Sequence, residues 1–304
     1  MSELTLIKKK FLSVASSGIY LSFKPAELND YYEELDQFLL LNTESLEAVD
    51  LFNLLEFQFC ISLMTNHDVK AKTLLDSLID QFDIKRSQRL KLLKSLYLEA
   101  TGSEADAMNL LDKDKNELRL SRRLTTFSRR TNNKEEYINN LNYYLSVQPL
   151  DLVTWAELAD EYQKLGHYDE AVFCLKEILL NEPFAYPIFY KVGLNYYYQF
   201  LQSENKIDSR DQYIEAVSIL TSARDNFLRC IEICDVYTKA WVGLYLITDI
   251  GFNDKLLKYK TVQEVATYLE DNKKIKPLSI QKIMALEDME DEKDVYLYLK
   301  RNSP

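Results

Sequence analysis

The hydrophobic positions between 151 and 183 fall into two helical stripes with a glycine between them. Apolar and aromatic side chains recur at spacings of three and four residues, as on one face of a helix. In the first half, these positions are Trp155, Leu158, Ala159 and Tyr162. Asp151 can cap this helix, and Gly166 can end it because glycine accepts the left-handed conformation that a helix terminus needs. A second stripe includes Ala171 and ends at Pro183, so the pattern predicts a helical hairpin.

The same pattern recurs 34 residues further along the chain. A large, an aliphatic, a small and a tyrosine residue return in the same order, at Phe189, Val192, Gly193 and Tyr196. A weaker copy lies 34 residues earlier, at Ser121, Leu124, Thr125 and Ser128. Further on, Ala223 occupies a second-helix position and Trp241 begins another first helix. A period near 34 with these residue types is typical of tetratricopeptide repeats.

The repeat predicts an all-α fold, a right-handed superhelical tetratricopeptide-type array of about six helical hairpins, each in contact with its neighbours. We expect the array to cover residues 46–254. Residues 1–45 and 255–304 fit the pattern poorly, so we expect them to act as an N-terminal and a C-terminal helical cap. Ser2 and the last residues are expected to be disordered.

Two segments depart from the regular spacing. The hairpin predicted over 86–111 is shortened, which leaves the register of the repeat open between 84 and 117. The stretch after Tyr196 is longer than one repeat and predicts an extended helix pair with an inserted segment around 203–210. The register is therefore also open between 203 and 222.

Small residues mark the places where two helices cross, because a larger side chain there would push the helices apart. Together with the large residues of each stripe and the residues that end the helices, they are interpreted as packing positions between repeats. These structural positions are Trp155, Leu158, Ala159, Tyr162, Gly166, Ala171, Pro183, Gly193, Ala223 and Trp241.

Composition and charge narrow the classes of function. The chain has 304 residues and a net charge of −11, which disfavours general binding to a nucleic-acid backbone. We therefore expect no nucleic-acid partner. The apolar runs near the N-terminus are too short for a secretory signal. No segment approaches the ~20 apolar residues of a membrane span, so membrane association is expected only through partner proteins.

The residue types that perform catalysis or bind metals have no motif around them. His67 and His167 fall in predicted turns, without a nucleophile or an acid at motif spacing. Cys230 and Cys234 share a helix face, but a metal site would need two more ligands and no histidine lies near them in sequence. We therefore expect no catalytic, cofactor-binding or metal-binding residues, and no cofactor.

Five arginines crowd one predicted first helix of this acidic chain. In the register of the weak repeat copy, Arg119, Arg122, Arg129 and Arg130 occupy positions that line the concave face of such arrays, whereas Arg123 does not. They can form an inner basic patch that receives an acidic segment or a lipid headgroup. The alternative interpretation is a solvated helix face.

Tyrosine is abundant, with 21 copies, and three are consecutive at 196–198. Successive helical residues turn by about 100°, so Tyr197 and Tyr198 cannot share the packing direction of Tyr196. We expect them, with Tyr190 on the same helix, to point along the inner groove and contact a partner, although local packing is the alternative. On the preceding first helix, the corresponding groove residues are Asp160 and Lys164.

Three stretches in a fixed order carry a resemblance to a known family. They are WAELADEYQKLGHYDEAVFCLKEILLNEP, PIFYKVGLNYYYQF and SARDNFLRCIEICDVYTKAWVGLYL. Over roughly residues 50–250, the chain resembles the tetratricopeptide subunit 2 of the endoplasmic reticulum (ER) membrane protein complex. The shared features are a WxELAxxY hairpin, an insertion in the next unit, an ARxxF helix, and a helix that begins at Trp241.

The resemblance implies a non-enzymatic cytosolic scaffold, peripheral on the cytosolic face of the ER membrane. That family caps a membrane-embedded insertase for tail-anchored and multi-spanning proteins. Its array holds cytosolic segments of subunit 5 in the groove. It also contacts subunits 1, 3 and 4, and a soluble subunit 8 or 9 where one exists. These partners are expectations from the resemblance alone.

Two other functions are alternatives to the scaffold. A tetratricopeptide co-chaperone adaptor that binds C-terminal peptides of a chaperone needs Asn and Lys on successive inner faces to hold the carboxylate. The corresponding positions here are Ala156 and Asp160, and an inward Asp160 would repel a carboxylate. An enzyme subunit with an α-α array, such as a prenyltransferase-like chain, needs a nucleophile or a zinc ligand set that the sequence does not offer.

Overall fold

The computed structural model describes residues 3–112, 117–130 and 133–289, together with residues 291, 294, 295, 298 and 299. Over these residues the chain forms fifteen α-helices and short 3-10 turns, and no strand. The predicted all-α fold is therefore confirmed. The disorder expected for Ser2 and the last residues lies outside the described residues.

The chain divides into two compact units, Met1–Asn140 and Leu141–Pro304. The division falls inside one helix, α8 (Lys134–Val147). Each unit is described by itself below. The expected limits of the repeat array, at 46 and 254, and the capping roles of the flanking segments stay predictions.

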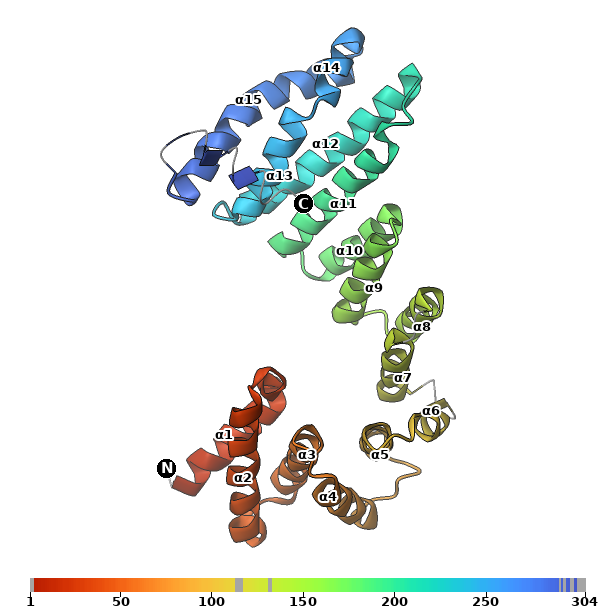
Figure 1. The fold of residues 1–304 in the computed structure, drawn as a ribbon, viewed down its shortest axis with the longest axis vertical. Coiled ribbons are helices and arrows are strands. Elements are labelled where there is room, and N and C mark those ends of the chain that lie inside the picture. Colours follow the sequence, from red (N-terminus) through yellow and green to blue (C-terminus); the bar gives the residue numbers. More distant parts are fainter. Residues whose placement is uncertain are drawn as a thin grey trace. The chain divides into compact units, whose positions relative to one another are not determined.

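Unit 1 consists of successive helical pairs (Figure 1). Its elements before α8 are α1 (Glu3–Ser17), η1 (Ile19–Ser22), α2 (Pro25–Asn42), η2 (Thr43–Ser45), α3 (Ala48–Met64), α4 (Asp68–Gln81), α5 (Gln88–Ala100), α6 (Glu104–Asp112) and α7 (Leu118–Arg130). The N-terminal pair buries Phe11 and Leu35 completely, so the segment expected to be a cap has a core of its own with α3.

Unit 2 also consists of successive helical pairs and includes the long helix α15 (Figure 1). Its elements after α8 are α9 (Leu152–Lys164), α10 (Tyr168–Asn181), α11 (Tyr186–Glu204), α12 (Arg210–Ile233), α13 (Thr238–Asp249), α14 (Phe252–Leu256), η3 (Leu257–Tyr259) and α15 (Gln263–Leu286). The extra residues around 203–210 lengthen α11 and α12 to 19 and 24 residues and form the turn between them. Ser209 begins α12 with a capping box to Gln212.

The hairpin between 151 and 183 has the local structure that its residues predict. The Asp151 side chain accepts hydrogen bonds from the first backbone N–H groups of α9. Gly166 has a φ of 78°, the left-handed conformation that closes the helix end. Gly102 and Asn66 adopt the same conformation between α5 and α6 and between α3 and α4, with φ of 85° and 61°. The same type of turn therefore closes three hairpins.

The 34-residue period is visible in side-chain hydrogen bonds of unit 2. Asn142 donates to the Tyr162 hydroxyl at 3.3 Å, and 34 residues later Lys176 donates to the Tyr196 hydroxyl at 2.9 Å. In each case, a second helix holds the tyrosine of the next first helix. The indole N–H groups of Trp155 and Trp241 likewise each donate, at 2.8 Å, to a backbone carbonyl six residues earlier. These tryptophans therefore anchor their helices to the preceding turn.

Close helix approach in unit 2 depends on two glycines that face one ring. A Cβ atom at Gly193 of α11 would lie 2.8 Å from the Phe227 ring of α12, and a Cβ atom at Gly243 of α13 would lie 2.7 Å from it. Ala223, one turn before Phe227, is fully buried, as is Ala171 of α10. The small residues therefore lie where a side chain would separate the helices.

Candidate partner-binding site

In each unit by itself, we call the first helices of the hairpins its first-helix layer: α3, α5 and α7 in unit 1, and α9, α11 and α13 in unit 2. Within each unit, neighbouring members are in contact, such as α5 with α7 and α11 with α13. Ion pairs also cross between them, from Arg89 to Glu56 in unit 1 and from Lys191 to Asp160 in unit 2. In each unit, an ion pair therefore connects neighbouring helices of the layer.

The arginines of α7 divide into a structural and an exposed group. Arg123 is buried; it pairs with Glu99 of α5, and its guanidinium carbon lies 4.5 Å from the centroid of the Phe127 ring. Arg130 approaches the other oxygen of Glu99, at 2.5 Å. One carboxylate on α5 thus pairs with two arginines of α7. Removing this carboxylate would leave the buried Arg123 charge unpaired, which is strongly destabilising.

The other predicted arginines lie outside that buried pair. Arg119 and Arg129 are exposed, and Arg122 is half-buried with one N–H donating to the Thr125 hydroxyl at 2.9 Å. The side chain of Arg130 is 66% exposed despite its contact with Glu99. The structure therefore presents positive charge at the four predicted positions, and their contact with a partner stays a prediction.

The two predicted charges on α9 are each paired. The Asp160 carboxylate lies 2.8 Å from the Lys191 ammonium of α11, and Lys164 lies 2.6 Å from Glu161, whose side chain is buried. Asp160 therefore does not present an isolated negative charge. The sequence feature that could have indicated this ion pair is a Lys 31 residues after an Asp. This separation is one 34-residue repeat less about one helical turn.

The predicted groove tyrosines of α11 lie partly in the core. The Tyr190 ring lies 5.7 Å from Phe227 and 5.5 Å from Tyr237, and burial raises the pKa of Tyr190 to about 12. Tyr197 also packs against the unit 2 core, and burial raises its pKa. Tyr198 stands further out, with its ring 5.7 Å from that of Tyr168 on α10. Local packing thus explains much of Tyr190 and Tyr197, and Tyr198 is half-buried with ring contacts to Tyr168 and Tyr197.

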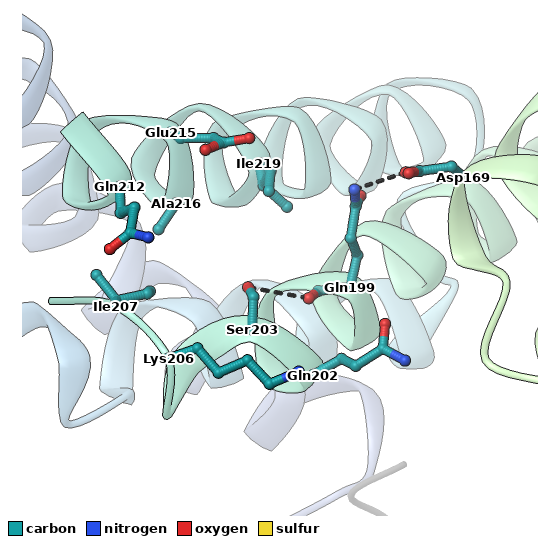
Figure 2. Close-up of a pocket in the computed structure, with 10 residues that line it drawn as sticks. All are labelled: Asp169, Gln199, Gln202, Ser203, Lys206, Ile207, Gln212, Glu215, Ala216 and Ile219. Atoms are coloured by element: carbon teal, nitrogen blue, oxygen red, sulfur yellow. Dashed lines mark hydrogen bonds between the residues drawn. The ribbon is translucent and has the colours of Figure 1, made fainter. Parts of the chain in front are cut away.

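A polar cavity of about 320 Å³ lies where the lengthened α11 and α12 meet the start of α10 (Figure 2). Gln199 donates to Asp169 at 2.5 Å on one side, while Lys206 and Glu215 line other parts of the wall. Amides and charges of both signs can hydrogen-bond a polar segment. The sequence analysis did not predict this cavity. The feature that could have indicated it is the inserted segment around 203–210.

A second cavity, of about 240 Å³, lies in unit 1 among α1, η1, α3 and α5. Arg89 spans it, donating to Asn53 at 2.8 Å and pairing with Glu56. Burial raises the pKa of the Cys60 thiol to about 11 and that of the neighbouring Tyr20 to about 12. Both groups therefore stay protonated at neutral pH and line the wall as neutral side chains.

Metal-ligating side chains and thiols were two candidate kinds of reactive group in this chain. No cluster of three or more His, Cys, Asp or Glu that could hold a metal occurs in the part of the chain that the structure describes. Burial raises the pKa of Cys174 and of Cys230 to about 12, which keeps the thiols in their unreactive form. Among the same residues, no helix is both long and apolar enough to cross a membrane.

Known proteins resemble this chain over most of its length, although no family model matches it. ER membrane protein complex subunit 2 of Saccharomyces cerevisiae is 22% identical over 262 residues, covering 82% of this chain and 87% of the relative. The TPR repeat protein oca3 of Schizosaccharomyces pombe is 29% identical, covering 72% and 73%. ER membrane protein complex subunit 2 of Dictyostelium discoideum is 30% identical, covering 39% and 38%.

A solved structure has the same type of fold. The C-terminal part of a TPR repeat-containing protein from Cytophaga hutchinsonii matches with a TM-score of 0.51 at 13% identity, covering 92% of this chain and 97% of that one. The tetratricopeptide-type fold predicted from the 34-residue period is therefore confirmed. The resemblance to subunit 2 of the ER membrane protein complex, first drawn from three sequence stretches, is confirmed by the named relatives.

Proposed function

We propose that this protein is a non-enzymatic scaffold subunit of an ER membrane protein complex and that its first-helix layer holds cytosolic segments of membrane subunits. The observation that carries the proposal is the match to subunit 2 from Saccharomyces cerevisiae, because it spans most of both chains. A match over most of both chains supports the function of the whole subunit. A match limited to one repeat would indicate only a shared type of repeat.

The geometry offers a physical route to this function. Neighbouring first helices are in contact within each unit, such as α11 with α13, and a pre-formed surface lowers the conformational cost of binding a partner. Arg119, Arg122 and Arg129 offer donors for acidic side chains of a partner segment. Tyr198 offers apolar area with a polar tip at low conformational cost. Most of the binding free energy then comes from these few side chains, which the packed helices hold in position.

The finer partner assignment belongs to the same proposal. We assign subunit 5 to the groove, with further contacts to subunits 1, 3 and 4 and to a soluble subunit 8 or 9. The protein would then be peripheral on the cytosolic face of the ER and support the insertion of tail-anchored and multi-spanning proteins. The resemblance supports these assignments, and the geometry is compatible with them.

The co-chaperone alternative fits the geometry less well. A clamp for a C-terminal carboxylate needs inward Lys and Asn side chains that are open to the ligand. Lys191 is paired with Asp160, and Asn195 is buried with its amide donating to the Lys191 carbonyl at 2.8 Å. Lys191 is therefore already paired with a carboxylate, and Asn195 is not open to a peptide terminus.

Membrane association through partners is the experimental consequence that tests the proposal. The tagged protein should sediment with microsomes that contain the membrane subunits at physiological salt. It should stay in solution with protein-free liposomes of ER lipid composition, because it would attach through protein contacts. Equal binding to bare liposomes, or no binding to either membrane, would contradict the scaffold function.

A further inference from the structure

The exposed side of α7 carries mostly arginine. The buried residues of this helix include Leu120 and Phe127, which lie on its opposite side. Because successive residues turn by about 100°, four of the five arginines fall within one arc of about the same width. We call them the arginine stripe: Arg119, Arg122, Arg129 and Arg130. Three of them are exposed, and Arg122 is half-buried.

The charge of α7 is not balanced within the helix. Its sequence, LRLSRRLTTFSRR, has five arginines and no acidic residue, in a chain whose net charge is −11. Glu99 of α5 supplies one carboxylate, which pairs with both Arg123 and Arg130. Glu117, just before the helix, has one carboxylate oxygen buried away from solvent. The exposed side of α7 is therefore predominantly positive, which selects a negatively charged ligand.

The two arginines that share Glu99 differ in how firmly they need it. The side chain of Arg123 is 8% exposed, whereas that of Arg130 is 66% exposed. A buried charge is costly without its partner, so Glu99 must stay beside Arg123. An exposed ion pair contributes little to stability. Arg130 can therefore exchange Glu99 for the carboxylate of a ligand at little cost, while Glu99 keeps its pair with Arg123.

Two anionic ligands are candidates, an acidic protein segment and an anionic membrane surface. A guanidinium donates two parallel N–H groups to one carboxylate, so several arginines in a row suit several Asp or Glu side chains. A membrane is an extended surface, and it would also face the acidic remainder of a chain with a net charge of −11. Because like charges repel, the charge of the whole chain favours a single acidic segment.

The length of the stripe sets the length of that segment. From Arg119 to Arg130 the helix rises by about 16 Å. We infer that the arginine stripe binds an acidic segment of a partner protein, with two or more Asp or Glu side chains within about five residues of extended chain, and that Arg130 exchanges Glu99 for one of them. The inference rests on the proposed scaffold function and specifies the chemistry of the partner segment that α7 binds.

The test measures binding of two short fluorescein-labelled peptides to the full-length protein by fluorescence anisotropy. One peptide alternates serine with glutamate, and the other alternates serine with glutamine. We expect the glutamate peptide to bind about tenfold more tightly or better, because only its side chains form charge-assisted hydrogen bonds. The difference should shrink as salt rises from about 50 to 300 mM, since exposed charges are screened. Vesicles of phosphatidylserine and phosphatidylcholine should not bind.

Variants connect the binding to the stripe. Arg119→Ala combined with Arg129→Ala should weaken binding of the glutamate peptide about tenfold. Lys85→Ala combined with Arg86→Ala is the matched control, because both residues are exposed and lie before α5; it should leave the affinity unchanged. Arg130→Ala should lower the affinity without lowering the melting temperature, because Glu99 keeps its pair with Arg123.

The outcomes separate this inference from the proposed function. Equal affinity for the two peptides, an equal loss in the stripe variant and its control, or binding to the vesicles in place of the glutamate peptide overturns the inference. An unchanged affinity in Arg130→Ala overturns the exchange with Glu99. The peptide assay needs no membrane subunit. Co-purification of membrane subunits from cells is therefore read separately, and their absence overturns the scaffold function whatever the peptides show.

Discussion

The ammonium group of Lys191 on α11 lies 2.8 Å from the carboxylate of Asp160 on α9. This contact joins two first helices that are separated in sequence by the whole of α10. It also gives an inward carboxylate a partner within its own chain. The charge of Asp160 is therefore balanced within this chain, whereas the exposed Arg119 and Arg129 of α7 present positive charge.

Removing this ion pair should have a small effect on stability. Both side chains are about two-fifths exposed, at 38% and 46%, so solvent screens their attraction. Asp160→Asn and Lys191→Met should each lower the free energy of unfolding by less than about 1 kcal/mol. Urea unfolding of both variants and of the double variant would measure the coupling, and 1 M salt should reduce it. A coupling that salt leaves unchanged would contradict a screened surface pair.

Adding a methyl group at Gly193 should destabilise unit 2 through Phe227. The new Cβ atom would lie 2.8 Å from the Phe227 ring, so α11 or the ring must move. We expect Gly193→Ala to cost about 1–3 kcal/mol, the usual range for overpacking. Combining it with Phe227→Leu should recover part of this loss, since the smaller side chain makes room. Strictly additive effects in thermal melting would show that the two residues do not compete for space.

A bulky residue at Ala171 tests the close packing of α10. Ala171 is fully buried, and Ala171→Trp should destabilise the protein by about 1–3 kcal/mol or more through overpacking. Leu180→Trp on the same helix is the control, because Leu180 is 77% exposed and has space around it. An unchanged melting temperature for Ala171→Trp would refute the assignment of this position to a helix crossing.

Reversing charge on α7 should weaken partner capture while the protein stays folded. Arg122→Glu combined with Arg129→Glu should reduce recovery of partner subunits about tenfold or more, since two charge-assisted contacts would be lost. Lys85→Glu combined with Arg86→Glu provides a charge-matched control, because both residues are exposed and lie before α5. Unaltered subunit stoichiometry in pull-downs of the double variant would exclude a partner role for these arginines.

Alkaline pH should destabilise the protein in part through its buried thiols. Burial raises the pKa of Cys174 and Cys230 from 9.0 to about 12. Above pH 9, the unfolded chain loses these protons while the folded protein keeps them, so stability falls as pH rises from about 9 to 12 and is fully present below pH 9. In urea unfolding at pH 8, 9 and 10, Cys174→Ala should show a shallower fall. An identical fall in both proteins would contradict this cause.

Local features of the hairpins could be predicted because single residues determine them. Asp151 caps α9 through its own side chain, and Gly166 closes the turn because it tolerates a φ of 78°. The small residue at Gly193 followed from the 34-residue period, and its structural reason is the Phe227 ring. These features need only the sequence within one repeat.

Contacts between repeats and beyond the periodic region were harder to predict. The repeat register separates Arg123 from Arg122, but no spacing indicates that the buried Arg123 pairs with Glu99 on another helix. The partial burial of Tyr197 depends on the core that α12 to α15 assemble. The cavity between α12 and α15 needs α15, which lies outside the repeat pattern, so no spacing in the sequence indicates it.

The most direct test of the central claim is the identity of the chains that accompany this protein from cells. The tagged full-length protein should be purified in mild detergent, and the bound chains identified and quantified by mass spectrometry. The account predicts multi-spanning membrane subunits of an ER membrane protein complex in fixed ratio to this chain. Recovery of a soluble chaperone without membrane subunits, or of no partner in fixed ratio, would contradict it.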